Sequence, residues 1–286
     1  MKTILNFYNF AAAEGFYLTG RFFLGKINRH DISQEGFCDP MDKVFLVASG
    51  KGGTGKTMFA VNLGALLARC GKRVALIDMD LGMRNMDLYL GMENRVVFNI
   101  ADAMSGMCRL SKALLKVNGF DSLYFMAASP RKDDRQITSK HMSALCDILK
   151  KYFDYVIIDC GAGIGQPLEA SIPAAQCAIV VTEPEVASLR DADTLVNFLS
   201  DHGLRNSYLV VNKIDNELIT AGVIPDIQSM INSSATPIAG MIEMDRRIRI
   251  STGRGVPIVC TEGTPIEENF RQIAGRILTD QPFPAY

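Results

Sequence analysis

One octapeptide near the start of the chain leaves the fewest choices for the fold: Gly50-Lys51-Gly52-Gly53-Thr54-Gly55-Lys56-Thr57. It follows the apolar run 44–48 and precedes a segment of helical length, 58–70. This is the context that the pattern G-x-x-x-x-G-K-[ST] requires, because the loop must connect a strand to a helix. Its glycines let backbone N–H groups turn inward around phosphate at the positive end of the helix. The octapeptide therefore predicts a phosphate-binding loop, and a ligand-free surface turn is the weaker alternative.

Two side chains of the loop have predicted roles of their own. Lys56 should hold the β- and γ-phosphates as a point charge and so take part in catalysis. The hydroxyl of Thr57 should bind Mg²⁺. Together with the backbone of residues 50–55, these side chains form the predicted nucleotide-binding set.

Beyond the loop, short apolar runs alternate with longer amphipathic segments. Such runs are typical of strands that are buried on both faces of a sheet. The alternation predicts an α/β fold of the P-loop NTPase type, with a mainly parallel, doubly wound sheet between helices. The expected strands are 44–48, 74–77, 123–126, 155–158, 178–181, 208–211 and 238–241, and the expected helices are 58–70, 137–152, 186–201, 218–232 and 266–278. Residues 41–286 should form this one domain.

Acidic residues follow two of the expected strands. Asp78 and Asp80 lie at the end of the second strand, and Asp159 follows four apolar residues at the end of the fourth. Ligands of open α/β sheets bind at the carboxyl ends of the strands. Asp159 has the Walker B arrangement and should bind Mg²⁺, directly or through water. For an isolated Asp after a strand, a helix cap or a turn is the ordinary alternative.

Lys51 is the unusual member of the octapeptide. A second lysine is not needed to hold phosphate within one subunit, and two nearby cations repel each other. The sequence Lys51-Gly52-Gly53 resembles the deviant Walker A motif of the MinD/ParA family. The resemblance extends from residue 43 to about 278, and several further segments are most similar to MinD members. These segments are 80–87, 93–98, 128–133, 184–193 and 250–257.

The resemblance implies an ATP-hydrolysing dimerisation switch for spatial regulation of cell division, with ATP and Mg²⁺ as ligands. Lys51 would reach across a homodimer to the partner's phosphates in the manner of an arginine finger. Asp80 would orient the attacking water, with support from Asp78. Asn212 would contact adenine, although Asn212-Lys213-Ile214-Asp215 superficially resembles a guanine-reading motif. Gly161 departs from the proline that MinD relatives usually carry.

The implied partners are a MinC-like division inhibitor and a MinE-like or topological regulator. Two other functions remain open: a FlhG-like regulator of flagellar number, suggested by 161–164, and a ParA-like DNA-partitioning ATPase. DNA is an unfavoured partner, because 30 Lys and Arg against 31 Asp and Glu give no global basic field. The seven cysteines contain no C-x-x-C pair, so a bound cluster is not expected either, and they indicate a reducing cytoplasm.

The two ends of the sequence differ from the rest. Residues 1–40 contain eight of the 23 Phe and Tyr residues, together with the cations Arg21, Lys26 and Arg29. This composition is compatible with an interfacial membrane anchor, and the alternative is a disordered extension upstream of Met41. The last residues, 279–286, contain two prolines and one acid and should not form a membrane helix. The expected location is the cytoplasm, with the inner face of the membrane as a possible second site.

Overall fold

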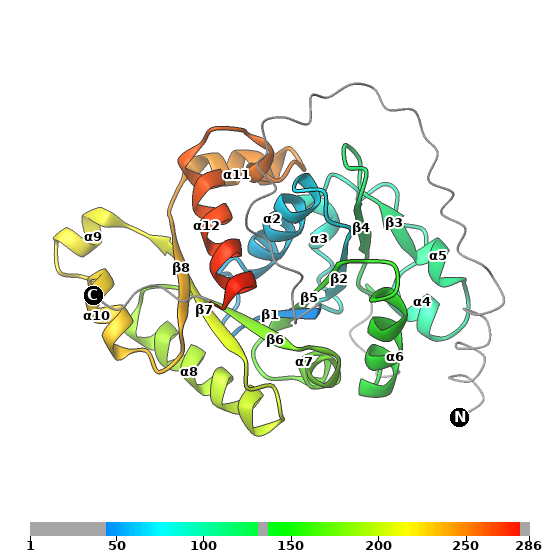
Figure 1. The fold of residues 1–286 in the computed structure, drawn as a ribbon, viewed down its shortest axis with the longest axis horizontal. Helices are drawn as coiled ribbons and strands as arrows, with labels where there is room; N and C mark the ends of the chain where they lie inside the picture. The colour runs from blue at the N-terminus through cyan, green and yellow to red at the C-terminus, as the bar shows by residue number, and fades with distance from the viewer. Residues whose placement is uncertain (1–43, 131–136, 281–286) are drawn as a thin grey trace.

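A computed structural model describes residues 44–130 and 137–280, and the predictions for residues 1–40 and for the extreme carboxyl end lie outside these ranges. The described residues form one eight-stranded sheet with helices on both faces (Figure 1). The strands are β1 Val44–Ser49, β2 Val74–Met79, β3 Leu114–Lys116, β4 Leu123–Met126, β5 Tyr155–Ala162, β6 Cys177–Thr182, β7 Ser207–Ile214 and β8 Ile238–Glu243. Their order across the sheet is β3-β4-β2-β5-β1-β6-β7-β8.

The sheet confirms the predicted fold class. Every strand pair is parallel except β3 with β4, which is antiparallel at one edge. All seven predicted strands are present. The sequence prediction missed β3, because a run of three residues with one exposed member carries too little periodicity to stand out.

Helices cover the sheet in two layers, as Figure 1 shows. α2 and α12 lie on one face, with α11 beside them, and α6, α7 and α8 lie on the other. The longer helices are α2 Lys56–Arg69, α6 Ser139–Leu149, α8 Val186–Asp201, α11 Arg246–Gly253 and α12 Pro265–Thr279. The shorter helices are α3 Met86–Tyr89, α4 Ile100–Met104, α5 Leu110–Ala113, α7 Gln166–Ser171, α9 Asn216–Thr220 and α10 Ile227–Ser233, with 3-10 turns at Ile172–Ala174 and Ile258–Cys260.

The hydrophobic core has two parts, one on each side of the sheet. Phe45 and Val47 of β1 pack in the same cluster as α2 and α12, whereas Leu46 and Ala48 pack in the cluster of α6 and α8. Successive side chains of a strand point to opposite faces, so a continuous apolar run supplies both clusters. α2 is buried along nearly its whole length, since α12 and the second 3-10 turn cover its outer side.

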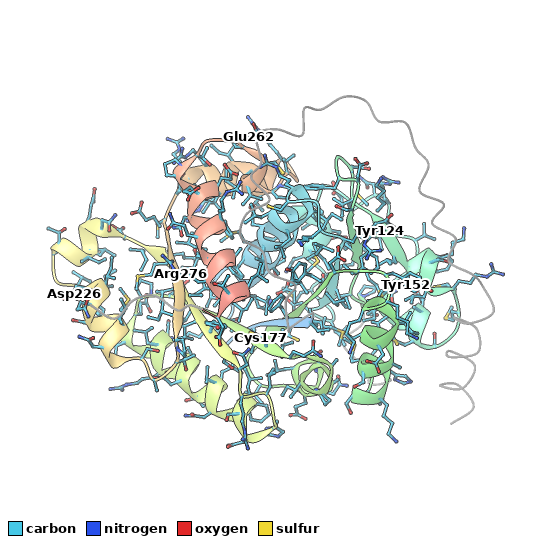
Figure 2. The ribbon with its side chains drawn as sticks, in the orientation of Figure 1. Tyr124, Tyr152, Cys177, Asp226, Glu262 and Arg276 are labelled. Atoms are coloured by element: carbon cyan, nitrogen blue, oxygen red, sulfur yellow. The ribbon has the colours of Figure 1, made fainter. Side chains whose placement is uncertain are left out.

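Polar contacts fix α12 to the sheet. Arg276, labelled in Figure 2, donates from Nη1 to the carbonyl of Ala239 in β8 at 3.1 Å. Asn269 donates to the carbonyl of Met241 at 2.6 Å. These bonds satisfy carbonyls near the sheet edge, where β8 has a single neighbouring strand. No helix in the described residues is both long and apolar enough to cross a membrane.

One predicted helix is wrong. The segment 218–232 is not continuous, because α9 ends at Thr220 and α10 begins at Ile227. Gly222 lies between them at φ 68, a left-handed conformation that ends a helix, and Pro225 follows without an N–H to donate. The other four predicted helices are present: 186–201 matches α8 at both ends, and the boundaries of the other three differ by one to three residues.

Candidate functional site

The predicted phosphate loop runs from the end of β1 to the start of α2. Gly53 and Gly55 have φ values of 84 and 94, in the left-handed region that glycine adopts without strain. A Cβ at Gly52 or Gly53 would meet no atom within 4 Å, so the outer side of the loop is open. α2 begins at Lys56, directly after the loop, as a phosphate site at a helix N-terminus requires.

A group of buried charges lies beneath the loop. Lys56 Nζ is 3.3 Å from Asp80 Oδ2 and 3.8 Å from Asp159 Oδ1, and the Lys56 side chain is only 9% exposed. Burial lowers the pKa of Lys56, but the charges of Asp159 and Asp80 outweigh it and the pKa is raised above its usual value. Lys56 is therefore a fixed cation at the base of the loop. The three residues come from three different segments, β1–α2, β2 and β5.

Asp159 fits the predicted Mg²⁺ site. It is fully buried, and neither carboxylate oxygen accepts a hydrogen bond from another described residue. Burial raises its pKa to about 6, although Lys56 and the hydroxyl of Thr57 act in the opposite direction. A buried carboxylate that accepts no hydrogen bond is costly, and the amine of Lys56 at 3.8 Å offsets only part of this cost, since the pKa remains raised. Thr57 and Asp159 are oxygen ligands of the kind that Mg²⁺ takes, so the residues present fit this ion.

Asp78 organises the segment that carries Asp80. Its carboxylate accepts hydrogen bonds from the backbone N–H groups of Asp80 at 2.9 Å and Met86 at 3.3 Å. Burial and the nearby Asp159 raise the pKa of Asp78 to about 8. Asp80 itself is partly exposed and lies beside β5, where a Cβ at Gly161 would be 3.0 Å from Asp80 Oδ1. The missing side chain at Gly161 therefore gives the Asp80 carboxylate room.

Lys51 lies apart from this buried group. Its amine is 3.4 Å from Asp191 Oδ2 and 3.5 Å from Ser188 Oγ, both in α8. The side chains of Lys51 and Asp191 are 42% and 45% exposed. α8 can approach the loop because Gly50 has no side chain: a Cβ there would be 2.8 Å from Asp191 Cβ. The first lysine of the loop is therefore held at the surface by its own chain.

Asn212 and Asp215 at the end of β7 are both engaged in the structure. Asn212 is 4% exposed and donates from Nδ2 to the carbonyl of Thr54 at 2.7 Å. Asp215 caps α9, since Oδ1 accepts from the N–H groups of Glu217 at 2.9 Å and Leu218 at 3.4 Å. The structure thus places Asn212 against the phosphate loop, and its contact with adenine stays a prediction.

Sequence reasoning assigned no role to several residues that contact the loop. Lys213 donates from Nζ to the carbonyl of Gly53 at 2.7 Å and lies 2.5 Å from Glu183 Oε1. Ser188 and Asp191 hold Lys51. Segment 184–193 was recognised as similar to MinD members, but only the fold shows which of its side chains face the loop.

A family model and a curated relative both cover most of the chain. The model of the CobQ/CobB/MinD/ParA nucleotide binding domain matches residues 45–258. The septum site-determining protein MinD of Synechocystis sp. is 37% identical over 244 residues, which cover 85% of this chain and 92% of that protein.

Two solved structures have the same fold. The MinC:MinD cell division protein complex of Aquifex aeolicus contains a chain that matches with a TM-score of 0.75 and 33% identity, over 85% of this chain and 97% of that chain. The septum site-determining protein MinD of Pyrococcus horikoshii, complexed with Mg-ADP, matches with a TM-score of 0.73 and 26% identity, over 81% and 94% of the two chains.

Proposed function

Because this chain belongs to the MinD family of septum site-determining proteins, within the CobQ/CobB/MinD/ParA nucleotide-binding group, we propose that it is a Mg²⁺-dependent ATPase that switches between monomer and dimer. The resemblance found in the sequence is thereby confirmed. The observation that carries the proposal is that the two lysines of the loop differ in burial and in their partners. Lys56 is buried among acids, whereas Lys51 is exposed and held only by a surface pair.

The proposed chemistry follows from the buried group. When a nucleotide binds, the amine of Lys56 turns from Asp80 to the phosphates, which present more negative charge. Asp80 is then free to accept a hydrogen bond from the attacking water and orient it. Thr57 and Asp159 would hold Mg²⁺, which neutralises charge on the phosphate oxygens when bound. The protein contributes mainly by positioning these groups at the strand ends.

We propose ATP rather than GTP as the substrate. Recognition of guanine by an N-K-x-D sequence needs a free carboxylate that accepts from the N1–H and amino groups of the base. The carboxylate of Asp215 already accepts two backbone N–H groups at the start of α9. Its use for guanine would leave the first turn of that helix uncapped, at a cost of about 1 kcal/mol.

Dimerisation is proposed to require the release of Lys51. In the single chain the amine lies on α8, where Asp191 and Ser188 hold it away from the chain's own Lys56. An exposed ion pair contributes only about 0–1 kcal/mol, so the lysine can be withdrawn at low cost. A second copy with ATP bound would offer the phosphates that Lys51 then contacts.

The partners remain proposals of the same kind. The solved structure from Aquifex aeolicus is a MinC:MinD complex. It supports a MinC-like inhibitor as the protein that binds the dimer of this chain. A MinE-like or topological regulator would then act on hydrolysis. Contact with the inner face of the membrane is proposed through residues 1–40, which lie outside the described ranges.

Two experiments test the proposal. The molar mass of the chain should double in Mg-ATP but not in Mg-ADP when it is measured by light scattering after size exclusion, with Asp80→Asn used to slow turnover. A chain that stays monomeric in both nucleotides would refute the dimerisation switch. Sedimentation with anionic liposomes, comparing the full chain with one that begins at Met41, tests the membrane contact, and binding by neither chain would refute it.

A further inference from the structure

The end of β7 contacts the phosphate loop through two consecutive side chains. Asn212 Nδ2 donates to the carbonyl of Thr54 and Lys213 Nζ donates to the carbonyl of Gly53, each at 2.7 Å. Consecutive residues of a regular strand point to opposite faces of the sheet. Two neighbours can reach the same loop only if the strand is irregular at this point.

The backbone shows this irregularity. The register of β7 against β8 shifts between Val211 and Ile214, the interval that contains both donors. Lys213 has φ 60, and in the described residues only Arg84 and Asp280 are other non-glycine residues with positive φ. A left-handed conformation is unfavourable for a side chain as long as lysine, and such strain persists where the surroundings enforce it. The contacts with Gly53 and with Glu183 identify the surroundings that enforce it here.

The two hydrogen bonds determine where the loop's donors point. A peptide unit is planar and trans, so its N–H points away from its C=O. With the carbonyls of Gly53 and Thr54 held by β7, the N–H groups of Thr54 and Gly55 point to the opposite side. Neither N–H donates to another residue in the described ranges 44–130 and 137–280. They are therefore free for an anion on that side.

Glu183 completes the contact from a third segment. Its Oε1 is 2.5 Å from Lys213 Nζ, and its side chain is 23% exposed. Glu183 follows β6, and the neighbouring Thr182 donates to the carbonyl of Ser188 at 2.9 Å, which fixes the start of α8. The amine of Lys213 therefore joins the phosphate loop to the β6–α8 connection.

We propose that Lys213, held by Glu183, is a positioning residue that orients the N–H groups of Thr54 and Gly55 toward the nucleotide phosphates. This assignment rests on the proposed nucleotide function and adds two residues to the site. The donors are oriented before the ligand arrives, so the phosphates do not have to order the loop. ADP and ATP contact the same part of the loop, and the contribution is expected to be similar for both. Loss of the amine then raises KM more than it lowers kcat.

The test measures binding of Mg-ADP to the full chain by titration calorimetry, and KM and kcat for ATP by phosphate release. Lys213→Ala and Lys213→Gly should each weaken ADP binding about tenfold, while Glu183→Gln should weaken it about threefold because a neutral acceptor remains. Lys213→Arg should stay within about threefold of the unmodified chain, since the guanidinium keeps a charged donor.

One control variant and one diagnostic variant determine how the result is interpreted. Lys116→Ala is the matched control: this lysine pairs with Asp121 at 3.3 Å in an exposed position on β3, and its loss should leave nucleotide binding unchanged. Lys213→Gly relieves the left-handed backbone without supplying an amine, so normal binding by this variant would overturn the role of the side chain.

The proposed function can fail separately. If the unmodified chain does not bind Mg-ADP, the nucleotide function is refuted and the positioning role falls with it. If the unmodified chain binds and the Lys213 variants bind equally well, only the positioning role is refuted. Thermal unfolding without nucleotide identifies any variant that does not fold, and in that case the Arg and Gln variants decide the outcome.

Discussion

The two ends of the phosphate loop have opposite environments. At the α2 end, the side chain of Lys56 is 9% exposed and lies between Asp80 and Asp159. At the β1 end, Lys51 is 42% exposed and its partner Asp191 is 45% exposed. The same residue type is thus held within a buried group of acids at one end and in an exposed ion pair at the other. The proposed roles of the two lysines, in nucleotide binding and in association, depend on this difference in burial.

The largest effect is expected at the buried end of the loop, where Lys56 can be replaced. Lys56→Ala should weaken Mg-ADP binding at least about 100-fold, because it removes the fixed cation beneath the phosphates, a loss of about 2.7 kcal/mol. Titration calorimetry measures this effect. Binding within about tenfold of the unmodified chain would show that the backbone of the loop is sufficient, and the contrast with Lys51 would be lost.

When no nucleotide is present, the buried carboxylate of Asp159 should lower the free energy of unfolding. Burial raises the pKa of Asp159 to about 6, above its value near 3.9 in an unfolded chain, so the folded form binds more protons in this interval. Stability then falls as pH rises from about 4 to 6. Asp159→Asn should stabilise the nucleotide-free chain by about 1–2 kcal/mol at pH 7.5.

Urea unfolding at pH 4 and pH 7.5 measures this effect. The gain should be mostly lost at pH 4, where Asp159 is protonated in the folded chain and about half protonated in the unfolded chain. The same variant should lose the Mg²⁺ dependence of nucleotide binding. A loss of stability at pH 7.5 would indicate that the ion pair with Lys56 outweighs the burial of Asp159.

Lys51 should behave in the opposite manner. Lys51→Ala should change Mg-ADP binding by the single chain less than about twofold, because an exposed pair contributes about 0–1 kcal/mol. The dimer expected in Mg-ATP should be weakened instead, as measured by light scattering. Asp191→Asn provides the matched variant, since it releases Lys51 without removing it, and it should not weaken the dimer. Equal effects of Lys51→Ala and Lys56→Ala on ADP binding would contradict the comparison.

Among these pairs, an exposed ion pair outside the site should have the smallest effect on stability. Arg73 and Asp154 are 3.0 Å apart, with side chains that are 53% and 35% exposed, and the hydrogen bonds from Arg73 lower the pKa of Asp154 despite some burial. A lowered pKa stabilises the folded chain above the unfolded value and loses that effect as pH falls through the folded value. Asp154→Asn should therefore destabilise by less than about 1 kcal/mol at pH 7 and by nothing measurable near pH 2.

The sequence predicted the main framework because its signals are local. Continuous apolar runs indicated seven of the eight strands, and the octapeptide with Asp80 and Asp159 indicated which strand ends meet. Gly222 and Pro225 are also visible in the sequence, but the prediction of a helix over 218–232 did not take them into account. Short helices such as α3 and α5, with four residues each, give no periodic signal.

The contacts of Lys213 could not be predicted in this way. They depend on a register shift in β7, on a left-handed residue and on a strand order that brings Glu183 beside the loop. None of these is a local property of the sequence Asn212-Lys213-Ile214-Asp215. The same holds for Asp191, whose segment was recognised but whose contact with Lys51 depends on the absence of a side chain at Gly50.

The central position of β1 has a consequence for biosynthesis. β1 pairs with β5 and β6, which begin more than 100 residues later in the chain. During translation the phosphate loop is made early, but its flanking strand lacks a first neighbour until β5 has been made at about residue 162 and a second until about residue 182, and the β7 contacts come later still. Such long-range pairing is slow, and unpaired strand edges are prone to aggregation until it is complete. The loop is thus expected to reach its binding conformation late, after β7 has been made, and a chain that ends before β7 should bind nucleotide poorly.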